Sequence, residues 1–325
     1  MNAPYLPEDD TSMVTRAAWL HYAGGLTQSQ VAKRLGLTSL KAHRLIARAN
    51  QEGRIKVFID GSVRQCTELE DEISGRYGLD YCEVVPAFDD SDLPLRALGR
   101  AGALYLKRAI DHGAHRLIGV GHGRTLAACI DYLPRTRASK TKFVSLLGGF
   151  SRRFAANPHD VIHRLAEKTD AQAFALPLPF YADSRKDREI MLSQKSVRDV
   201  LTMAQESSLK LAGIGNVDVD ASTVDSGMIE AHEILAARKA GAIGELLGHF
   251  FDANGQLCHT PLSHRTMALE PDQWSDSKIV AVAGGKNKVA AIRAILTGRL
   301  LSGLLTDELS AKALIASSNG HHAHP

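Results

Sequence analysis

The sequence has few cysteines and no long hydrophobic run, although it is 325 residues long. The four cysteines (Cys66, Cys82, Cys129 and Cys258) are scattered and include no C-x-x-C pair, so they do not make a disulfide framework. Reduced thiols in a cytoplasm are therefore expected. No apolar run reaches the roughly 18 residues that would span a bilayer. Residues 1–12, MNAPYLPEDDTS, are acidic and lack the apolar core of a signal peptide, and we expect them to form a short disordered arm.

Recognisable catalytic motifs are equally scarce. The sequence contains no G-x-S-x-G elbow, no H-E-x-x-H pair and no cysteine in a nucleophile motif. Among the fourteen histidines only His122 lies in an informative place, inside a glycine-rich loop. His321, His322 and His324 could bind a metal, but a frayed polar tail has no preorganised geometry for one. We therefore expect no catalytic residue, no metal and no cofactor.

The clearest motif that is present is TQSQVAKRLGLTSLKAHRLI, at residues 27–46. Apolar residues recur with a 3.6-residue period on both sides of Gly36, where the chain must turn sharply. Thr27 and Gln30 form a capping-box pattern for the first helix, and Thr38 is a natural N-cap for the second. The apolar positions are Val31, Ala32, Leu35, Ala42, Leu45 and Ile46. This pattern predicts a helix-turn-helix, whose second helix can enter the major groove of DNA.

Short helix-turn-helix patterns also occur in proteins that never touch DNA, and the local charge favours one interpretation. Between residues 12 and 59 the only acidic residue is Glu52, whereas the formal charge of the whole chain is only +3. The basic residues of this segment are Arg16, Lys33, Arg34, Lys41, Arg44, Arg48, Arg54 and Lys56. Phosphate neutralisation supplies most non-specific DNA affinity and needs such local clustering. The N-terminal segment is therefore predicted to bind DNA.

The outer face of the second helix is the expected contact surface. The predicted DNA-binding residues are Gln28, Thr38, Ser39, Lys41, His43, Arg44 and Arg48. Arginine and lysine can read guanine, and hydroxyl groups can bind phosphates. Gln28 and Arg48 are expected to contact the DNA backbone. The next segment, RIKVFID at residues 54–60, alternates polar and apolar residues and is expected to form a short strand, either a wing or the exit toward a second domain.

Two domains are expected for a chain of this length and ordinary composition, 44% apolar and 23% charged. We place the boundary near residue 61, which gives a DNA-binding domain at residues 1–61 and an effector and oligomerisation domain at residues 62–325. From about residue 80, short apolar runs alternate with longer amphipathic segments. The predicted strands are residues 116–121, 142–147, 171–176, 209–215 and 278–284. This alternation predicts a doubly wound, Rossmann-like α/β fold with a parallel sheet covered on both faces.

Residues 248–260, GHFFDANGQLCHT, differ from this pattern. Two strand-like runs flank Asn254-Gly255, which is a strong hairpin signal. We therefore expect an antiparallel excursion late in the chain, with its turn at Asn254 and Gly255.

Glycine-rich segments follow several predicted strands, and open α/β sheets bind ligands at those strand ends. Residues 119–125, GVGHGRT, place N–H groups, a hydroxyl and a guanidinium before a helix that starts near Leu126, which favours an anion such as phosphate. Arg124 stands where a dinucleotide fingerprint would need glycine, and a Walker A loop would need G-K-[ST]. The alternative is that these glycines only pack a strand against a helix.

Other strand ends add residues to this candidate site. Lys288 follows Gly284-Gly285 at a helix start, where a bound anion would relieve its repulsion from the helix dipole. Glu245 and Asp252 flank a strand near the expected hairpin and could hydrogen-bond hydroxyl groups. The candidate effector-binding residues are Gly121, His122, Gly123, Arg124, Thr125, Gly148, Gly215, Glu245, Asp252 and Lys288.

These motifs, in this order, resemble the SorC family of bacterial sugar-responsive transcriptional regulators, which is also grouped with the DeoR-type sugar regulators. The resemblance extends from about residue 13 to about residue 317. Besides the N-terminal motif, it is carried by GVGHGRTL, PLPFYADS, LAGIGNVD, GAIGELLGHFFDANG and VAVAGGKNKVAAIRAILTGRLLSGLLTDELSAKALI. Within the family, the N-terminal run TRAAWLHYAGGLTQSQVAKRLG is most similar to regulators of erythritol and related polyol catabolism.

The resemblance implies an effector domain like the sugar-phosphate isomerase and glucosamine-phosphate deaminase folds, used as a sensor without turnover. It also implies homo-oligomers, commonly tetramers built as dimers of dimers, that bind pseudo-palindromic operators. In the family, the loop matching residues 121–125 holds a phosphate, and the residues matching Glu245 and Lys288 contact the sugar. His122 and Arg124 depart from the commoner loop pattern, so the anion could be a carboxylate or a differently placed phosphate, or the ligand could be unphosphorylated.

We therefore expect a cytoplasmic transcriptional regulator, not an enzyme, that controls a sugar or polyol catabolic operon. Its expected partners are double-stranded operator DNA, a sugar or polyol phosphate and further copies of itself, with no membrane. Repression relieved by the effector is the expected sign, with activation as the alternative. Two other classes remain open. A sugar-phosphate isomerase or deaminase with a DNA-binding appendage would need a paired acid and base beside the phosphate loop, which the sequence does not show. An adaptor with a degenerate pocket would show no ligand-induced stabilisation.

Overall fold

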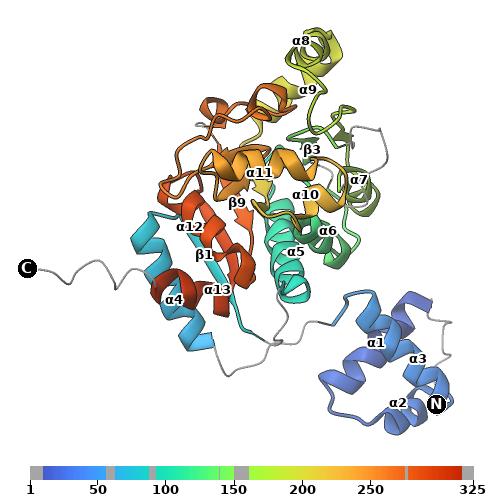
Figure 1. Ribbon diagram of the computed structural model, residues 1–325. Coiled ribbons are helices and arrows are strands. Elements are labelled where there is room, and N and C mark those ends of the chain that lie inside the picture. Colours follow the sequence, from blue (N-terminus) through green and yellow to red (C-terminus); the bar gives the residue numbers. More distant parts are fainter. Residues whose placement is uncertain are drawn as a thin grey trace, which may run out of the picture. The chain divides into compact units, whose positions relative to one another are not determined.

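The computed structural model describes residues 10–55, 63–87, 93–138, 140–149, 161–274 and 277–316. Residues 1–9 of the expected N-terminal arm, residues 56–60 of the predicted strand and the C-terminal histidines lie outside the described residues. The chain divides into two compact units, Met1–Asp60 and Gly61–Pro325, and each is described on its own (Figure 1).

The first unit is made of three helices, α1 (Asp10–Tyr22), α2 (Gln28–Leu35) and α3 (Ser39–Gln51). The predicted capping box is present, because Gln30 N donates to Thr27 Oγ1 (3.3 Å) while Thr27 N donates to Gln30 Oε1 (2.8 Å). Gly36 ends α2 with a φ of +66°, a left-handed conformation that glycine adopts without a steric penalty. Thr38 caps α3 by accepting the N–H of Lys41 (3.3 Å). The predicted helix-turn-helix is therefore confirmed.

One small apolar core joins the three helices of the first unit. All six apolar positions of the predicted motif are buried in it, together with residues from α1 and the end of α3. The buried residues of this core are Val14, Ala17, Ala18, Leu20, Val31, Ala32, Leu35, Ala42, Leu45, Ile46 and Ala49. The residues of this core lie close together in the sequence, between residues 14 and 49. The periodicity of the apolar residues could therefore identify most of the core.

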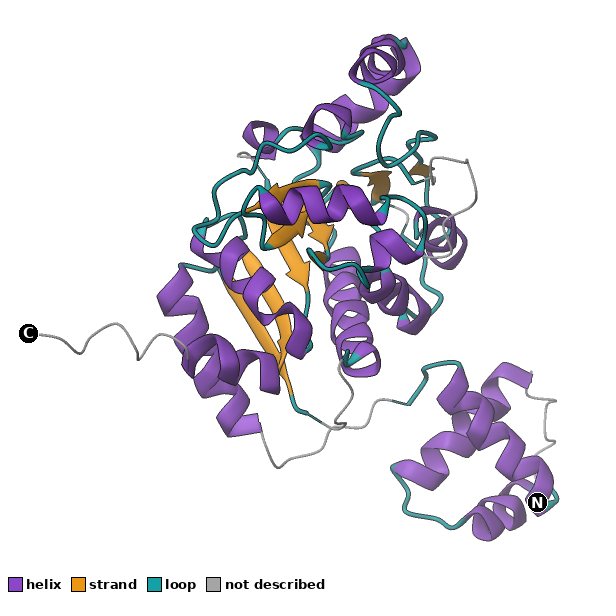
Figure 2. Ribbon diagram, viewed as in Figure 1, coloured by secondary structure: helices purple, strands orange, loops and turns teal. Residues whose placement is uncertain are grey.

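The second unit is built on a seven-stranded, all-parallel sheet with the strand order β1-β10-β9-β5-β2-β3-β4 (Figure 2). The strands are β1 (Tyr81–Val85), β2 (Leu117–Val120), β3 (Lys142–Ser145), β4 (Ala173–Phe174), β5 (Leu209–Ala212), β9 (Lys278–Val282) and β10 (Gly303–Asp307). The predicted doubly wound α/β fold is confirmed. Strands β1 and β10 were not among the predicted ones. For β10 the reason is visible in LLSGLLTDELSAKALI, where a helix starts at Glu308 directly after the strand and neither glycine nor proline marks the boundary.

Helices cover both faces of this sheet. Side chains from α5 (Leu95–His112), α6 (Arg124–Tyr132) and α7 (Ile162–Thr169) share one apolar cluster with the strand residues of one face. The opposite face is covered by α4 (Val63–Tyr77), α9 (Lys195–Glu206), α12 (Val289–Thr297) and α13 (Glu308–Ala316). Within β9 the faces alternate, since Val280 and Val282 join the first cluster while Ile279 and Ala281 join the second. Among the described residues, no helix is both long and apolar enough to cross a membrane.

The predicted strand at residues 209–215 is wrong as a single element. The chain forms β5 in the large sheet, passes Gly213 and then forms β6 (Ile214–Asn216) in a separate antiparallel sheet with β7 (Gly244–Leu246) and β8 (His249–Phe251). A continuous apolar run cannot reveal this break, because residues in both strands are buried.

The expected antiparallel excursion is present, but the hairpin predicted around Asn254 and Gly255 is wrong. Strands β7 and β8 are joined at Leu247 and Gly248, whose φ values are +50° and +85°, as a tight two-residue hairpin turn requires. Asn254-Gly255 forms a later turn, after which a single bridge joins Phe251 and Leu257. Leucine is rare at positive φ, so residues 246–248 carry no recognisable turn signal.

The remaining short elements of the second unit lie between residues 185 and 288. They are α8 (Arg185–Ser193), α10 (Ser222–Asp225), α11 (Ala231–Lys239) and the 3-10 turns η1 (Ser263–Arg265), η2 (Pro271–Trp274) and η3 (Lys286–Lys288).

Candidate DNA-binding surface and ligand pocket

Helix α3 of the first unit divides into an exposed and a buried face. Ser39, Lys41, His43 and Arg44 are exposed, as predicted, while Ala42, Leu45, Ile46 and Ala49 are buried. The side chains of Lys41 and Arg44 form no ion pair with any residue the structure describes. An exposed helix face with unneutralised cations is the arrangement that helix-turn-helix proteins present to the major groove.

Besides the capping residue Thr38, three of the predicted DNA-binding residues already form side-chain contacts within the unit. His43 Nδ1 lies 3.1 Å from Gln28 Oε1, which links α3 to the start of α2. Arg48 Nε donates to Glu52 Oε1 at 2.6 Å, and the other carboxylate oxygen of Glu52 accepts from Arg54 Nε at 2.6 Å. Part of the predicted basic charge is therefore balanced by the one acidic side chain of the segment.

The sequence analysis did not single out Leu40, whose side chain is 60% exposed between Ser39 and Lys41. An exposed leucine at the start of α3 offers an apolar contact of the kind that recognises the methyl group of thymine. Its position beside the capping residue Thr38 could have been noticed, but leucine is usually assigned to a core.

The second unit contains a pocket where the order of the sheet strands reverses. From β2 the chain moves through β3 to β4 on one side, and then crosses back to place β5 on the other side of β2. Ligands of open α/β sheets bind at such switch points, beyond the carboxyl ends of the strands. The pocket has a volume of about 60 Å³, room for about four to six water molecules at roughly 10–15 Å³ each. It is lined by Gly121, His122, Gly123, Arg124, Thr125, Leu126, Leu147, Phe180, Gly213, Ile214, Gly215, Asn216, Ala221, Thr223, Ser226, Met228, Glu245, Leu247 and Lys288.

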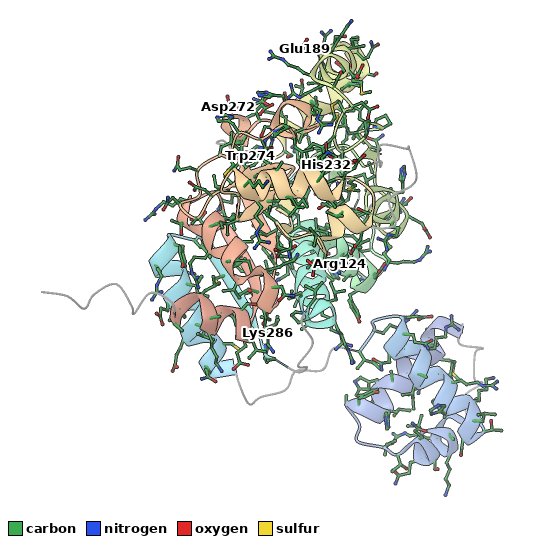
Figure 3. The ribbon with its side chains drawn as sticks, in the orientation of Figure 1. Arg124, Glu189, His232, Asp272, Trp274 and Lys286 are labelled. Carbon is green, nitrogen blue, oxygen red and sulfur yellow. The ribbon has the colours of Figure 1, made fainter. Side chains whose placement is uncertain are left out.

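One end of the pocket is the N-terminus of α6. The helix begins at Arg124, two residues before the predicted start, and its N-cap is Gly123, so no side chain caps its first turn. Thr125 is buried in this turn, and Arg124 contributes a half-buried guanidinium (Figure 3). Uncapped N–H groups, the positive end of the helix dipole and an arginine together favour an anion.

Glu245 on β7 and Lys288 at the end of η3 also line the pocket. Burial raises the pKa of Glu245 to about 7, although the N–H of Gly248 (2.6 Å from Oε1) and the nearby Lys288 favour the charged form. Burial likewise lowers the pKa of Lys288 to about 8, with Arg124 adding to the shift and Glu245 opposing it. Lys288 Nζ donates to Ile214 O at 2.7 Å. Strongly shifted titratable groups gathered in one pocket are typical of a functional site.

The loop that carries Lys288 is held by a buried hydrogen-bond network. Gly285 N donates to Asp307 Oδ2 (2.9 Å) and approaches Ser310 Oγ (2.8 Å), while Ser310 donates to Asp307 through both its N–H and its hydroxyl. Asp307 ends β10, and both it and Ser310 are buried. Lys288 is thus positioned from a neighbouring strand end.

The structure brings eight of the ten candidate effector-binding residues to this pocket and leaves two outside it. Gly148 packs where a Cβ would collide with the carbonyl oxygen of Pro179, and its N–H donates to Met267 O (2.9 Å). The Asp252 carboxylate accepts N–H bonds from Asn254 (2.9 Å) and Gln256 (2.8 Å), so it caps the turn. Both candidates were wrong as pocket residues, because each satisfies a local structural need.

The sequence analysis missed the side chains that close the pocket on its other sides. Phe180 packs edge-to-face on His122 with a centroid distance of 4.9 Å, and Thr223, Ser226 and Met228 come from the segment that contains α10. Asn216 lies at the end of β6. Only the extra strand end at β6 carried a signal, in GNVD, whereas the other residues lie in segments without glycine-rich or charged motifs.

The comparison with protein families identifies the second unit: residues 62–316 match the family described as "Putative sugar-binding domain". A helix-turn-helix unit followed by such a domain defines a sugar-binding transcriptional regulator, and this chain belongs to the SorC family of these regulators. The chain is 53% identical over 315 residues to the erythritol catabolism regulatory protein EryD of Brucella abortus, covering 97% of this chain and all of that protein. It is 33% identical to the transcriptional regulator LsrR of an Enterobacter strain, over 94% of each chain.

Solved structures share the same fold. The full-length sorbitol operon regulator SorC from Klebsiella pneumoniae has a TM-score of 0.71 at 23% identity and covers 94% of this chain and 99% of its own. A DeoR family transcriptional regulator from Listeria monocytogenes has a TM-score of 0.71 at 20% identity, covering 77% of this chain and 100% of its own.

The alternative of an enzyme with a DNA-binding appendage can now be judged. Glu245 and Lys288, which the sequence named as separate candidates, both line the pocket beside the glycine loop, so a carboxyl and an amino group are present there. The relatives are nevertheless transcriptional regulators and not enzymes.

Proposed function

We propose that this regulator represses a polyol catabolic operon and is released from its operator by a small phosphorylated polyol or sugar. The pocket carries the proposal: an anion site at the start of α6 faces a pocket that also holds Glu245 and Lys288. The phosphate would lie against the N–H groups of residues 123–125 with Arg124, and the hydroxyl groups would meet Glu245 and Lys288. The 53% identity to an erythritol catabolism regulator supports a four-carbon polyol as the first ligand to test.

The DNA-binding part of the proposal rests on α3. Lys41 and Arg44 would contact base edges or phosphates, with Ser39, Leu40 and His43 beside them. Two copies of the first unit would read two half-sites one helical turn apart, so we propose a homo-oligomer, a dimer or a dimer of dimers, that acts in the cytoplasm. No cofactor is needed, because the effector acts by binding.

Effector control follows from thermodynamic linkage. An effector that binds one arrangement of the oligomer more tightly than the other shifts the population toward it. Operator affinity then changes by the same coupling free energy, about 1–3 kcal/mol, or about 5- to 150-fold. If the protein is a repressor that the effector releases, the effector would lower operator affinity by that factor.

The experiment measures both partners together. Fluorescence anisotropy with DNA fragments from the promoters around its own gene gives operator affinity, with and without erythritol, phosphorylated erythritol and five-carbon polyol phosphates. A matched thermal-shift series gives binding to the second unit, which should gain about 2.7 kcal/mol at a ligand concentration 100 times Kd. If none of these compounds changes either quantity, the proposed effector class is wrong. If DNA affinity rises with ligand, the proposed release of the operator by the effector is wrong.

A further inference from the structure

Residues 217–229 form a segment that crosses the pocket between β6 and α11. It contains the single-turn helix α10 and contributes Ala221, Thr223, Ser226 and Met228 to the pocket wall. Among the residues that the structure describes, the backbone turn bonds of this segment join its own members, for example Met228 N to Thr223 O (3.0 Å) and Gly227 N to Val224 O (2.9 Å). The segment is therefore attached by its side chains and its two ends, not by a sheet ladder.

Most apolar side chains of the segment are buried, and Thr223 and Ser226 line the pocket. Ala221, Met228 and Ile229 are buried, whereas Thr223 and Ser226 are half-buried at the pocket. The Ser226 hydroxyl donates to the carbonyl oxygen of Thr223 at 3.4 Å, whereas the Thr223 hydroxyl has no hydrogen-bond partner among the described residues. A half-buried hydroxyl directed at a pocket gains more from a ligand hydroxyl than from mobile solvent.

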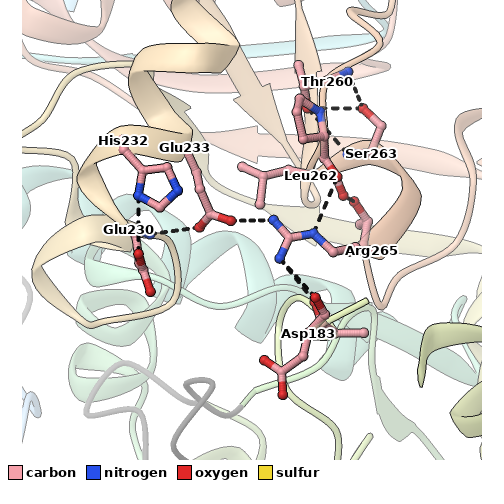
Figure 4. Close-up of polar contacts among 11 residues, drawn as sticks. Asp183, Glu230, His232, Glu233, Thr260, Leu262, Ser263 and Arg265 are labelled. Atoms are coloured by element: carbon pink, nitrogen blue, oxygen red, sulfur yellow. Dashed lines mark hydrogen bonds and ion pairs between the residues drawn. The ribbon is translucent and has the colours of Figure 1, made fainter. Parts of the chain in front are cut away.

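The end of the segment is fastened by a buried ion pair. Glu233, in the first turn of α11, accepts a very short bond from Arg265 Nη2 and also accepts the N–H of Glu230 at 3.0 Å (Figure 4). The Arg265 and Glu233 side chains are only 14% and 8% exposed. The other end is tied less firmly, since Asp218 pairs with the exposed Arg238 at 3.4 Å.

Arg265 also holds the opposite wall of the pocket. Its Nη1 approaches the carbonyl oxygens of Ala182 (3.5 Å) and Asp183 (3.4 Å), as Figure 4 shows for Asp183. These residues belong to the loop that carries Phe180, which lines the pocket. One guanidinium thus connects the start of α11 to the Phe180 loop, and it lies in η1 outside the pocket itself.

We infer that residues 217–229 are a lid whose Thr223 and Ser226 hydroxyls bind hydroxyl groups of the effector, with Arg265 as the residue that positions the lid. The inference rests on the proposed function, because it assigns these residues to the same pocket. It also divides the recognition of the ligand between two parts of the pocket. The N-terminus of α6 binds the anion, and the lid binds the polyol chain. Inorganic phosphate would then bind without the lid, while a phosphorylated polyol would need it.

The test compares two probes by isothermal titration, inorganic phosphate and terminally phosphorylated erythritol. Thr223→Val and Ser226→Ala should each weaken the polyol phosphate by about 3- to 10-fold, the effect of one neutral hydrogen bond, and change phosphate affinity by less than 2-fold. Thr297→Val is the matched control, since that exposed hydroxyl donates only to Arg293 O of its own helix (2.8 Å). Equal affinities of the wild type and both lid variants for the polyol phosphate would overturn the lid assignment alone.

The role of Arg265 needs a readout that general destabilisation would not produce. Arg265→Met should increase amide hydrogen exchange in residues 217–229 and weaken the polyol phosphate more than 10-fold, with phosphate binding retained. Arg265→Lys should recover part of this loss, because a lysine can still pair with Glu233. If Arg265→Met does not fold, exchange in the wild type decides, since the polyol phosphate should slow exchange in residues 217–229 and inorganic phosphate should not. Equal exchange with both probes would contradict the lid. If the wild type binds neither probe nor any other polyol phosphate, the proposed function fails and the lid fails with it.

Discussion

The two units of this protein position their candidate functional side chains in different ways. In the first unit, the side chains expected at DNA come from one helix, and the core that holds this helix is made of residues close in sequence. In the second unit, the pocket residues come from strands β6 and β7, from loops after β2, β3, β5, β7 and β9, and from the segments that contain Phe180 and residues 217–229. Only the tertiary fold brings these segments together. A local surface needs a periodic pattern, whereas a pocket at a strand switch point needs the whole topology.

The largest expected effect is a loss of operator affinity that arises from the first unit alone. Lys41→Ala combined with Arg44→Ala removes two exposed cations, and at about 1–3 kcal/mol per contact operator affinity should fall by at least 30-fold. Thermal unfolding should be unchanged, because neither side chain contributes to the core of its unit. Anisotropy with promoter DNA measures the loss, and Arg185→Ala with Lys195→Ala in the second unit is the control. Operator affinity within 3-fold of the wild type would refute the assignment of α3 as the reading helix.

The second expected effect is a gain in stability confined to the second unit. The pKa of Glu245 is raised to about 7, so the folded state loses stability as the pH rises from about 4.5 through 7 and the carboxylate becomes charged. Glu245→Gln should therefore raise the free energy of unfolding by on the order of 2–3 kcal/mol at pH 8 and by little at pH 5. Denaturant titrations at both pH values measure this difference.

The matched control for that stability gain is Glu189→Gln, an exposed carboxylate on α8. It should change stability by less than about 0.5 kcal/mol at either pH. A pH-independent effect of Glu245→Gln would show that burial of the charge is not what destabilises the pocket. The variant should also bind the effector less tightly, a cost in function for a gain in stability.

A smaller effect is expected at a helix cap in the first unit. Thr38→Ala removes the acceptor for the N–H of Lys41 and should destabilise that unit by about 1 kcal/mol. Hydrogen exchange should rise in α3 and stay constant in the large sheet. Thr38→Ser is the control, since serine keeps the acceptor. Faster exchange in both units would mean that they do not unfold independently.

The smallest effect is predicted for Arg48. Its guanidinium is paired with Glu52, so Arg48→Ala should lower operator affinity by less than about 3-fold, the size of an exposed pair or a single screened phosphate contact. A salt titration of operator binding sharpens the result, because each lost phosphate contact reduces the slope by about one. A 10-fold loss would indicate that the ion pair opens when DNA is bound.

Particular residues show how far sequence reasoning reached. The turn at Gly36 and the helix caps Thr27 and Thr38 could be predicted from the sequence. A positive φ and a side-chain acceptor are requirements that these residue types meet locally. The glycine loop before α6 was recognised for the same reason. Gly148 and Asp252 were assigned to the pocket because strand ends and carboxylates are common there, but each serves a local packing or turn requirement instead.

The sequence did not predict those residues whose role depends on distant segments. Nothing in the sequence around Thr223 and Ser226 indicates a pocket, and Arg265 acquires its role only through Glu233 and the carbonyl oxygens of residues 182 and 183. The break between β5 and β6 follows from pairing with β7, about 30 residues later. The periodicity of apolar residues along the chain gives no information on partners that lie far away in the sequence.

The sequence by itself determined the helix-turn-helix, its caps and its charge, the parallel α/β class and the anion loop before α6, because all of these are set by interactions among residues that are near in the chain. The tertiary structure alone decided which strand ends meet, which carboxylate is buried beside Lys288, and which segment covers the pocket. These choices depend on long-range strand pairing and on burial, which change the pKa of Glu245 and the exposure of Thr223 without any change in their neighbours along the chain.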